Sequence, residues 1–152
     1  MFTELQQKIV ARLDSAREAD AGTEPAGRLV PVDVRPYGGE ALRPKRLINS
    51  VPVCFVEFDV GAMEVEDYAG QIAGGEISLD VLCCTRNQSG GEAEYSDGLA
   101  LVTWTFEQLV GMEIDLEGVG TAYWTTMSVG RMMSGKDLWI AKVSPDLKLR
   151  RH

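Results

Sequence analysis

The sequence predicts an α+β fold, with a mainly antiparallel sheet of about four strands and two helices packed on one face of that sheet. Apolar residues recur with helical spacing in two stretches, one at the N-terminus and one in the second half of the chain. The other apolar runs are short, and they either alternate with polar residues or are rich in β-branched and aromatic side chains. The chain has 152 residues and no internal repeat, so we expect a single domain over residues 1–152.

The first predicted helix starts at Thr3 and ends before Gly22. Thr3 and Gln6 have the spacing of a capping box, and a glycine commonly follows a helix end. Its apolar residues are spaced three or four positions apart, which places them on one face. They are Phe2, Leu5, Ile9, Leu13 and Ala16.

Two strands are predicted in the next part of the chain. Residues 29–34 form a short extended run in which Pro31 favours an edge position. Residues 35–50 have the proline and glycine content of a long connection. The run from Val51 to Asp59 is apolar on both faces, so we expect a central strand that is covered on both sides.

The following segment, residues 61–75, is acidic and contains several glycines, which predicts an exposed loop or a hairpin tip. Residues 76–84 then alternate as a half-buried strand does. The apolar face of this strand is formed by Ile77, Leu79, Val81 and Cys83.

A second helix is predicted before residue 111, with Ser96 or Asp97 as its cap and Gly111 at its end. Its apolar repeat consists of Leu99, Val102, Phe106, Leu109 and Val110. Two further extended stretches follow, at residues 121–128 and 137–144. The order is therefore helix, strands, helix, strands.

The net charge of the chain is −8, from 15 basic and 23 acidic residues. This charge repels phosphate backbones and argues against sequence-independent binding of nucleic acid. No stretch resembles a membrane span or a secretion signal, so we expect no membrane partner and synthesis in the cytoplasm. The three cysteines, Cys54, Cys83 and Cys84, are expected to be reduced thiols packed within strands.

No catalytic, cofactor or metal site is predicted, and we do not expect an enzyme. The only histidine is His152, whereas nucleophile systems and many metal sites need an imidazole inside the fold. Residues 130–136 match the spacing of a phosphate loop, but Asp137 stands where such a loop needs Ser or Thr. We interpret residues 134–137 as a hairpin turn between the last two strands.

Two charged segments are candidates for contact with other proteins. The basic segment contains three cations around Pro44, and the acidic segment lies in the loop at residues 61–75. In a ring, two different surfaces of each copy meet, so segments of opposite charge would attract across every interface. The candidate interface residues are Arg43, Lys45, Arg46, Glu64, Glu66 and Asp67. Glu57 and Asp59 extend the acidic cluster, whose spacing fits no cation-binding loop.

The order of elements and some local sequence resemble the tail-terminator proteins of Mu-like contractile-tailed bacteriophages and prophages. The resemblance covers nearly the whole chain. It rests on the N-terminal helix with ELQQKIVARL, the VPVCFVEF strand, a strand that runs into Cys84-Thr85-Arg86-Asn87, a helix and two closing strands. Residues 90–94 differ from the longer, arginine-bearing loop that the resemblance leads us to expect before the second helix.

The resemblance implies a tail-terminator-like fold and a structural role in the virion. Such a subunit forms a hexameric ring at the head-proximal end of the tail. The ring caps the tube, stops its elongation and offers a docking surface to the head-neck. The implied partners are further copies of the chain, the tail tube protein, and the sheath and head-neck connector proteins. DNA would cross the ring only as passing cargo, and assembly would take place in the host cytoplasm.

Two other interpretations stay open at this point. A head-neck connector or tail-completion protein of the same virion can have a similar size. A small ligand-binding α/β domain would instead use the carboxylates at residues 57–67 or the glycine turn at residues 130–136.

Overall fold

A computed structural model describes residues 2–23, 25–60, 67–68, 71–72, 77–86, 92–134 and 137–150. Its main feature is a five-stranded sheet in the order β1-β2-β5-β9-β8. The strands of this sheet are β1 (Asp33–Pro36), β2 (Val53–Val60), β5 (Ile77–Arg86), β8 (Met127–Ser134) and β9 (Leu138–Pro145). Every neighbouring pair is antiparallel except β1 and β2, which are parallel.

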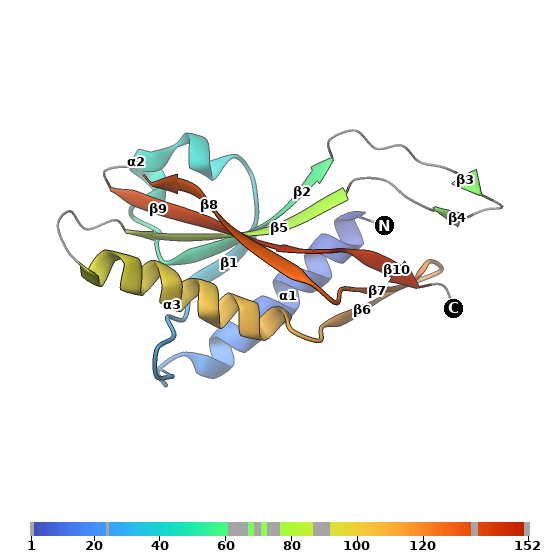
Figure 1. Ribbon diagram of the computed structural model, residues 1–152, viewed down its shortest axis with the longest axis horizontal. Coiled ribbons are helices and arrows are strands. Elements are labelled where there is room, and N and C mark those ends of the chain that lie inside the picture. Colours follow the sequence, from blue (N-terminus) through green and yellow to red (C-terminus); the bar gives the residue numbers. More distant parts are fainter. Residues whose placement is uncertain are drawn as a thin grey trace.

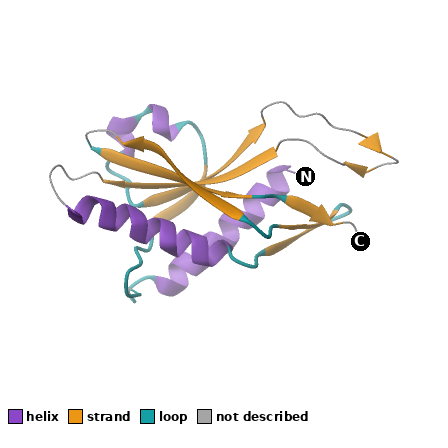
Figure 2. Ribbon diagram, in the orientation of Figure 1, coloured by secondary structure: helices purple, strands orange, loops and turns teal. Residues whose placement is uncertain are grey.

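Two long helices cover one face of this sheet. Helix α1 (Phe2–Asp20) packs on β1 and β2, and helix α3 (Glu92–Leu109) packs on β5 and β9. Figure 2 shows both helices on the same side of the strands. The opposite face carries the short 3-10 helix η1 (Glu40–Leu42) and helix α2 (Pro44–Leu47).

The larger core lies between the sheet and the two long helices. Helix α1 contributes Leu5, Ile9 and Leu13, which are spaced four residues apart and are almost fully buried. Against them lie inward-facing residues of the strands, and full burial of one such side chain contributes about 1.5–3 kcal/mol. These include Cys54, Val56, Val81, Cys83, Ala141 and Val143.

A smaller core lies on the opposite face, beneath the connection that contains η1 and α2. Leu47 of α2 packs on the outward-facing residues of three strands, with Tyr37, Ile48 and Val51 at its margin. Those strand residues are Val53, Phe55, Leu82, Cys84, Leu138 and Ile140. Strand β2 is therefore apolar on both faces, as the pattern of residues 51–59 predicted. Strand β5 was predicted to be half-buried, but it is also covered on both faces.

A second sheet lies beyond the C-terminal end of α3 (Figure 1). It has the order β10-β7-β6, with β6 (Glu113–Leu116), β7 (Gly120–Tyr123) and β10 (Lys148–Arg150). The indole nitrogen of Trp124, just after β7, donates to the carbonyl oxygen of Leu109 at 2.8 Å. This bond satisfies a carbonyl at the open end of α3. A separate two-stranded hairpin pairs β3 (Asp67–Tyr68) with β4 (Gln71–Ile72).

The α+β class and the two helices on one face agree with the sequence prediction, whereas the number of strands does not. The main sheet has five strands, and the predicted strand at residues 121–128 falls partly on β7 of the small sheet and partly on the start of β8. Strands β6 and β10 and most of β8 were not predicted. Residues 40–47 are helical, although the whole connection was predicted to be irregular. Helix α3 begins at Glu92, so the prediction of a cap at Ser96 or Asp97 was wrong. Gly111, with φ of 71°, follows the helix end as predicted.

Gly98 is required where α3 crosses β9. A Cβ atom at this position would lie 2.5 Å from Cε3 of Trp139, whose ring is buried. Gly98→Ala should therefore lower the free energy of unfolding by roughly 1–2 kcal/mol, because overpacking outweighs the gain of about 1 kcal/mol in helix propensity. Urea unfolding measures this change.

Gly130→Ala is the matched control, since a Cβ atom there meets no atom within 4 Å. It should change the free energy of unfolding by less than about 0.5 kcal/mol. Equal effects of the two substitutions would contradict the packing argument.

Candidate interaction surfaces

The structure places the predicted basic residues together and leaves most of the acidic ones undescribed. Arg43, Lys45 and Arg46 are all exposed on η1–α2 and the turn between them. Glu64 and Glu66 lie outside the described residues. Asp67 belongs to β3, but its side chain is not described. The predicted pairing of the basic and acidic segments across an interface therefore stays a prediction.

The first candidate surface, which we name the basic flank, consists of Leu42, Arg43, Lys45 and Arg46. Leu42 is 85% exposed, which is a large value for an aliphatic side chain. Strand β1 and the η1–α2 segment meet at a pocket of about 190 Å³ that Arg35, Arg43 and Arg46 line together with Glu40. The flank thus combines positive charge with one exposed apolar residue.

The second candidate surface, the α3–β8 flank, consists of Leu99, Phe106, Val110 and Val129. These side chains are 58%, 39%, 58% and 51% exposed, respectively. The three helix residues are seven and four positions apart, so they form one stripe along α3. Covering each half-exposed side chain would contribute on the order of 1 kcal/mol.

This stripe lies on the side of α3 that faces away from α1. Trp104 and Gln108 mark the other side, because Trp104 donates to Asp20 of α1 at 2.8 Å and Gln108 lines a groove shared with α1. Val129 pairs with the buried Val143 of β9 and therefore points to the face that carries the helices. It remains exposed because α3 packs on β5 and β9 and leaves β8 uncovered.

The charge on α3 has a single sign. Its sequence contains four acidic residues, Glu92, Glu94, Asp97 and Glu107, and no basic residue. Glu107 is engaged, since hydrogen bonding from Arg28 lowers the pKa of the Glu107 carboxyl. Asp97 is exposed near the helix start, and Asp137 is exposed just before β9. Asp97 is seven positions before Trp104 and therefore lies on the side of α3 that faces α1, outside the apolar stripe.

The two end strands of the main sheet differ in how well they are protected. Strand β1 has four residues, ends at Pro36 and is preceded by Pro31, and neither proline can donate a hydrogen bond to another strand. Strand β8 has eight residues, no proline, and exposed residues from 128 to 132. A register shift between Arg131 and Met133 is its one irregularity. The β8 edge is thus the more open of the two.

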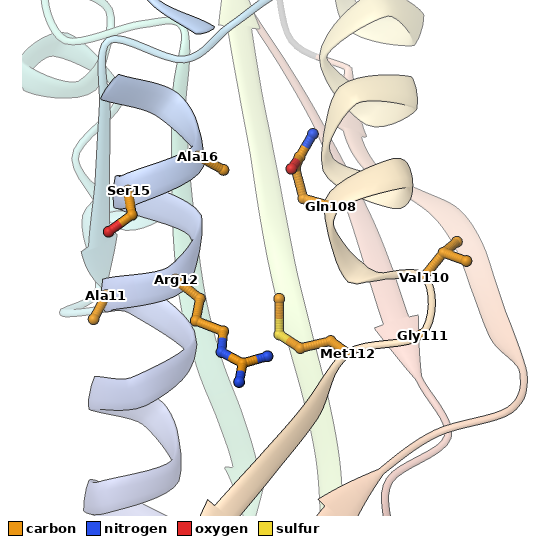
Figure 3. A pocket seen from close by; sticks show the side chains of 8 residues that line it. All are labelled: Ala11, Arg12, Ser15, Ala16, Gln108, Val110, Gly111 and Met112. Carbon is orange, nitrogen blue, oxygen red and sulfur yellow. The ribbon is translucent and has the colours of Figure 1, made fainter. Parts of the chain in front are cut away.

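A groove of about 490 Å³ separates α1 from the C-terminal end of α3 (Figure 3). It is lined by Ala11, Arg12, Ser15, Ala16, Gln108, Val110, Gly111 and Met112. Arg12 is the only charged residue among them, and its side chain extends toward Met112 at the end of α3. A cation in this position complements the helix dipole, which gives Arg12 a structural role. In the same view Val110 points away from the groove.

One buried carboxylate lies on the sheet face opposite the long helices. Asp80 of β5 is only 3% exposed, and its Oδ1 accepts a hydrogen bond from Oγ of Ser144 at 2.5 Å. Nζ of Lys142 lies 3.6 Å from its Oδ2. Both partners are on β9, so the group ties the two central strands together and satisfies the buried charge.

The cysteines are free and buried, as predicted. Sγ of Cys54 and Sγ of Cys83 each lie 3.4 Å from Oγ1 of Thr105 on α3. Hydrogen bonding with Cys83 and burial raise the pKa of Cys54, and burial raises the pKa of Cys84. In the part of the chain that the structure describes, no group of His, Cys, Asp or Glu residues could hold a metal ion.

Residues 130–134, the first part of the phosphate-loop match, are extended within β8 and therefore do not cradle an anion. Antiparallel pairing of β8 with β9 agrees with the predicted chain reversal, although residues 135–136 of the turn lie outside the described part. Within the described ranges, no helix is long and apolar enough to cross a membrane.

Comparisons of this chain with protein-family models, with curated proteins and with solved structures return no match.

The sequence analysis assigned Leu99, Phe106 and Val110 to the repeat of α3 without separating them from the residues that are buried. Val102 and Leu109 are in the core, whereas the other three are on the surface. The five residues span about 100° of the helix circumference, which is an ordinary width for a core-facing stripe. The repeat therefore held no signal that separates the exposed residues from the buried ones.

The buried thiols lead to a chemical prediction. Only the thiolate reacts, so Cys54 and Cys84 should resist a maleimide or Ellman's reagent at pH 8 in the folded protein and react after unfolding in urea. Mass spectrometry of the labelled protein measures this difference. Rapid labelling of the native chain would contradict the described packing.

The pKa values of Cys54 and Cys84 are raised in the folded state. The free energy of unfolding should therefore fall as the pH rises above about 8.5, where the thiols of the unfolded chain ionise.

Proposed function

We propose that this chain is the tail terminator of a contractile-tailed bacteriophage or prophage. In this role it forms a hexameric ring that caps the tail tube, stops tube elongation and provides the docking surface for the head-neck. The ring would be located at the head-proximal end of the tail. Its partners would be the tube protein, with sheath and head-neck connector proteins as neighbours.

The observation that carries this proposal is the presence of two separate exposed surfaces with apolar side chains, one on the η1–α2 segment and one on α3 and β8. The basic flank includes Leu42, and the α3–β8 flank includes Phe106. A subunit of a cyclic ring needs two different contact surfaces, because each copy meets one neighbour through each surface. A protein whose function is assembly has this requirement, whereas an isolated domain does not.

The arrangement of elements also supports the proposal. The resemblance to tail terminators rests on an N-terminal helix, the strand in residues 51–59, a strand ending at Cys84-Thr85-Arg86, a helix and two closing strands. These correspond to α1, β2, β5, α3 and β9, while the first closing strand, expected at residues 121–128, overlaps β7 and only the first residues of β8. The net charge of −8 is compatible with DNA passing through a ring without being held.

Deletion of the gene from the parent phage should give tails of uncontrolled length, because nothing would stop the tube from growing. Negative-stain electron microscopy of lysates measures the length distribution, and expression of the intact chain from a plasmid should restore a single length. Tails of normal length would remove the terminator assignment. If such tails lacked heads, the chain would instead be a head-neck connector or tail-completion protein.

A further inference from the structure

The pocket of about 190 Å³ beside the η1–α2 segment carries an excess of positive charge. It is lined by Arg35 from β1, by Arg43 and Arg46 from the η1–α2 segment, and by Glu40. Asp33 forms an ion pair with Nε of Arg35. When Asp33 is included in the count, three positive charges still stand against two negative ones. In a chain whose net charge is −8, this excess is a local feature.

Two of these cations have no partner within the described part of the chain. Arg43 and Arg46 form neither an ion pair nor a side-chain hydrogen bond with any described residue. Glu40 is engaged elsewhere, since its Oε2 accepts a hydrogen bond from the backbone N–H of Gly38 at 2.6 Å. Like charges around one pocket repel each other, and an anion bound in the pocket would offset that repulsion.

The volume of the pocket limits the size of its ligand. At about 30 Å³ for each molecule of liquid water, 190 Å³ corresponds to roughly six waters. Pockets for drug-sized ligands start at about 300 Å³. The pocket therefore suits a small anion of the size of a phosphate group. Ser50 adds a half-buried side chain with a hydroxyl to the lining, and the buried Leu47 and Phe55 form its apolar part.

We propose that this pocket binds phosphate, either inorganic phosphate or the phosphate group of a small molecule. Guanidinium groups bind phosphate well, because their planar fork of N–H donors contacts two oxygens at once. Phosphate presents oxygens in several directions, which suits donors that come from both β1 and the η1–α2 segment. A carboxylate has fewer oxygens and less charge. The site goes beyond the proposed role in tail assembly and does not depend on it.

Isothermal titration calorimetry of the full chain with sodium phosphate, in Tris buffer at low salt, tests the site. The parent chain should bind phosphate with a Kd below about 1 mM. The variant R43Q/R46Q should bind at least about tenfold more weakly, because it removes both unpaired cations. Circular dichroism checks that the variant is folded. Absence of binding to the parent chain at about 10 mM phosphate would overturn the proposal.

The matched control is K45Q/R131Q, which removes the same amount of charge at two exposed residues that do not line the pocket. It should bind phosphate as the parent chain does. A loss equal to that of R43Q/R46Q would mean that overall charge alone attracts the anion, and it would reject the site.

Glu40→Gln tests the pocket in the opposite direction. Removal of a negative charge from the lining should tighten phosphate binding about threefold or more. Glu117→Gln removes the same charge at an exposed residue outside the pocket and should leave the Kd unchanged. Equal Kd values for the two variants would contradict binding in the pocket.

Two further titrations identify the anion. Acetate should bind at least about tenfold more weakly than phosphate, and equal binding of the two would reject phosphate as the ligand class. A short DNA duplex should not bind, because the net charge of −8 repels a polyanion. If the duplex binds through Arg43 and Arg46 while inorganic phosphate does not, these cations serve nucleic acid and the proposal is overturned.

Discussion

The burial of β5 on both faces is the constraint on which the rest of the structure depends. From Leu79 to Thr85 every side chain of this strand is buried. One face requires the long helices α1 and α3, and the other requires the η1–α2 connection, because a strand that is apolar on both sides must be covered on both sides. The one charge in this run, Asp80, is tolerated because Ser144 and Lys142 of the neighbouring strand supply its partners.

Element dimensions explain why one edge of the sheet remains open. Two packed helices, each about 10 Å wide, cover roughly 20 Å, whereas neighbouring strands are about 4.8 Å apart. The pair therefore covers about four strands. In this chain α1 lies on β1 and β2, and α3 lies on β5 and β9, so the fifth strand, β8, extends beyond the helices. The exposure of Val129 and of the outer stripe of α3 follows from this mismatch.

Much of the main sheet and its two helices could be predicted from the sequence, because α1, β2 and β5 have strong and simple periodicities. The small sheet of β6, β7 and β10 could not. Its strands have three or four residues, too few to display an alternation, and β10 pairs with β7 across 25 positions of sequence. Residues 40–47 were missed for a similar reason, since η1 and α2 are single turns whose stability comes from Leu47 in the smaller core.

The candidate surfaces were predictable only in part. The cluster of Arg43, Lys45 and Arg46 is visible as a run of charges, and such a run is exposed almost by necessity. The apolar stripe of α3 is different. Leu99 and Phe106 have the same periodicity as residues that are buried, and only the width of the sheet relative to the helices decides which side of α3 is covered. That width depends on how many strands pair, which is a property of the whole fold.

A ring that uses both flanks as its contact surfaces also constrains where its other partners would bind. In such a ring both flanks of every copy are occupied, and the β8 edge does not remain free to recruit another subunit sideways. Contacts with a tube or a neck would then use surfaces at the two ends of the strands. One end carries the β3–β4 hairpin and the sheet of β6, β7 and β10, and the other carries the start of α3 (Figure 1). Because these two ends are built from different elements, a ring of this subunit would present two unlike surfaces along its axis, which is the asymmetry that a cap on a polymer requires.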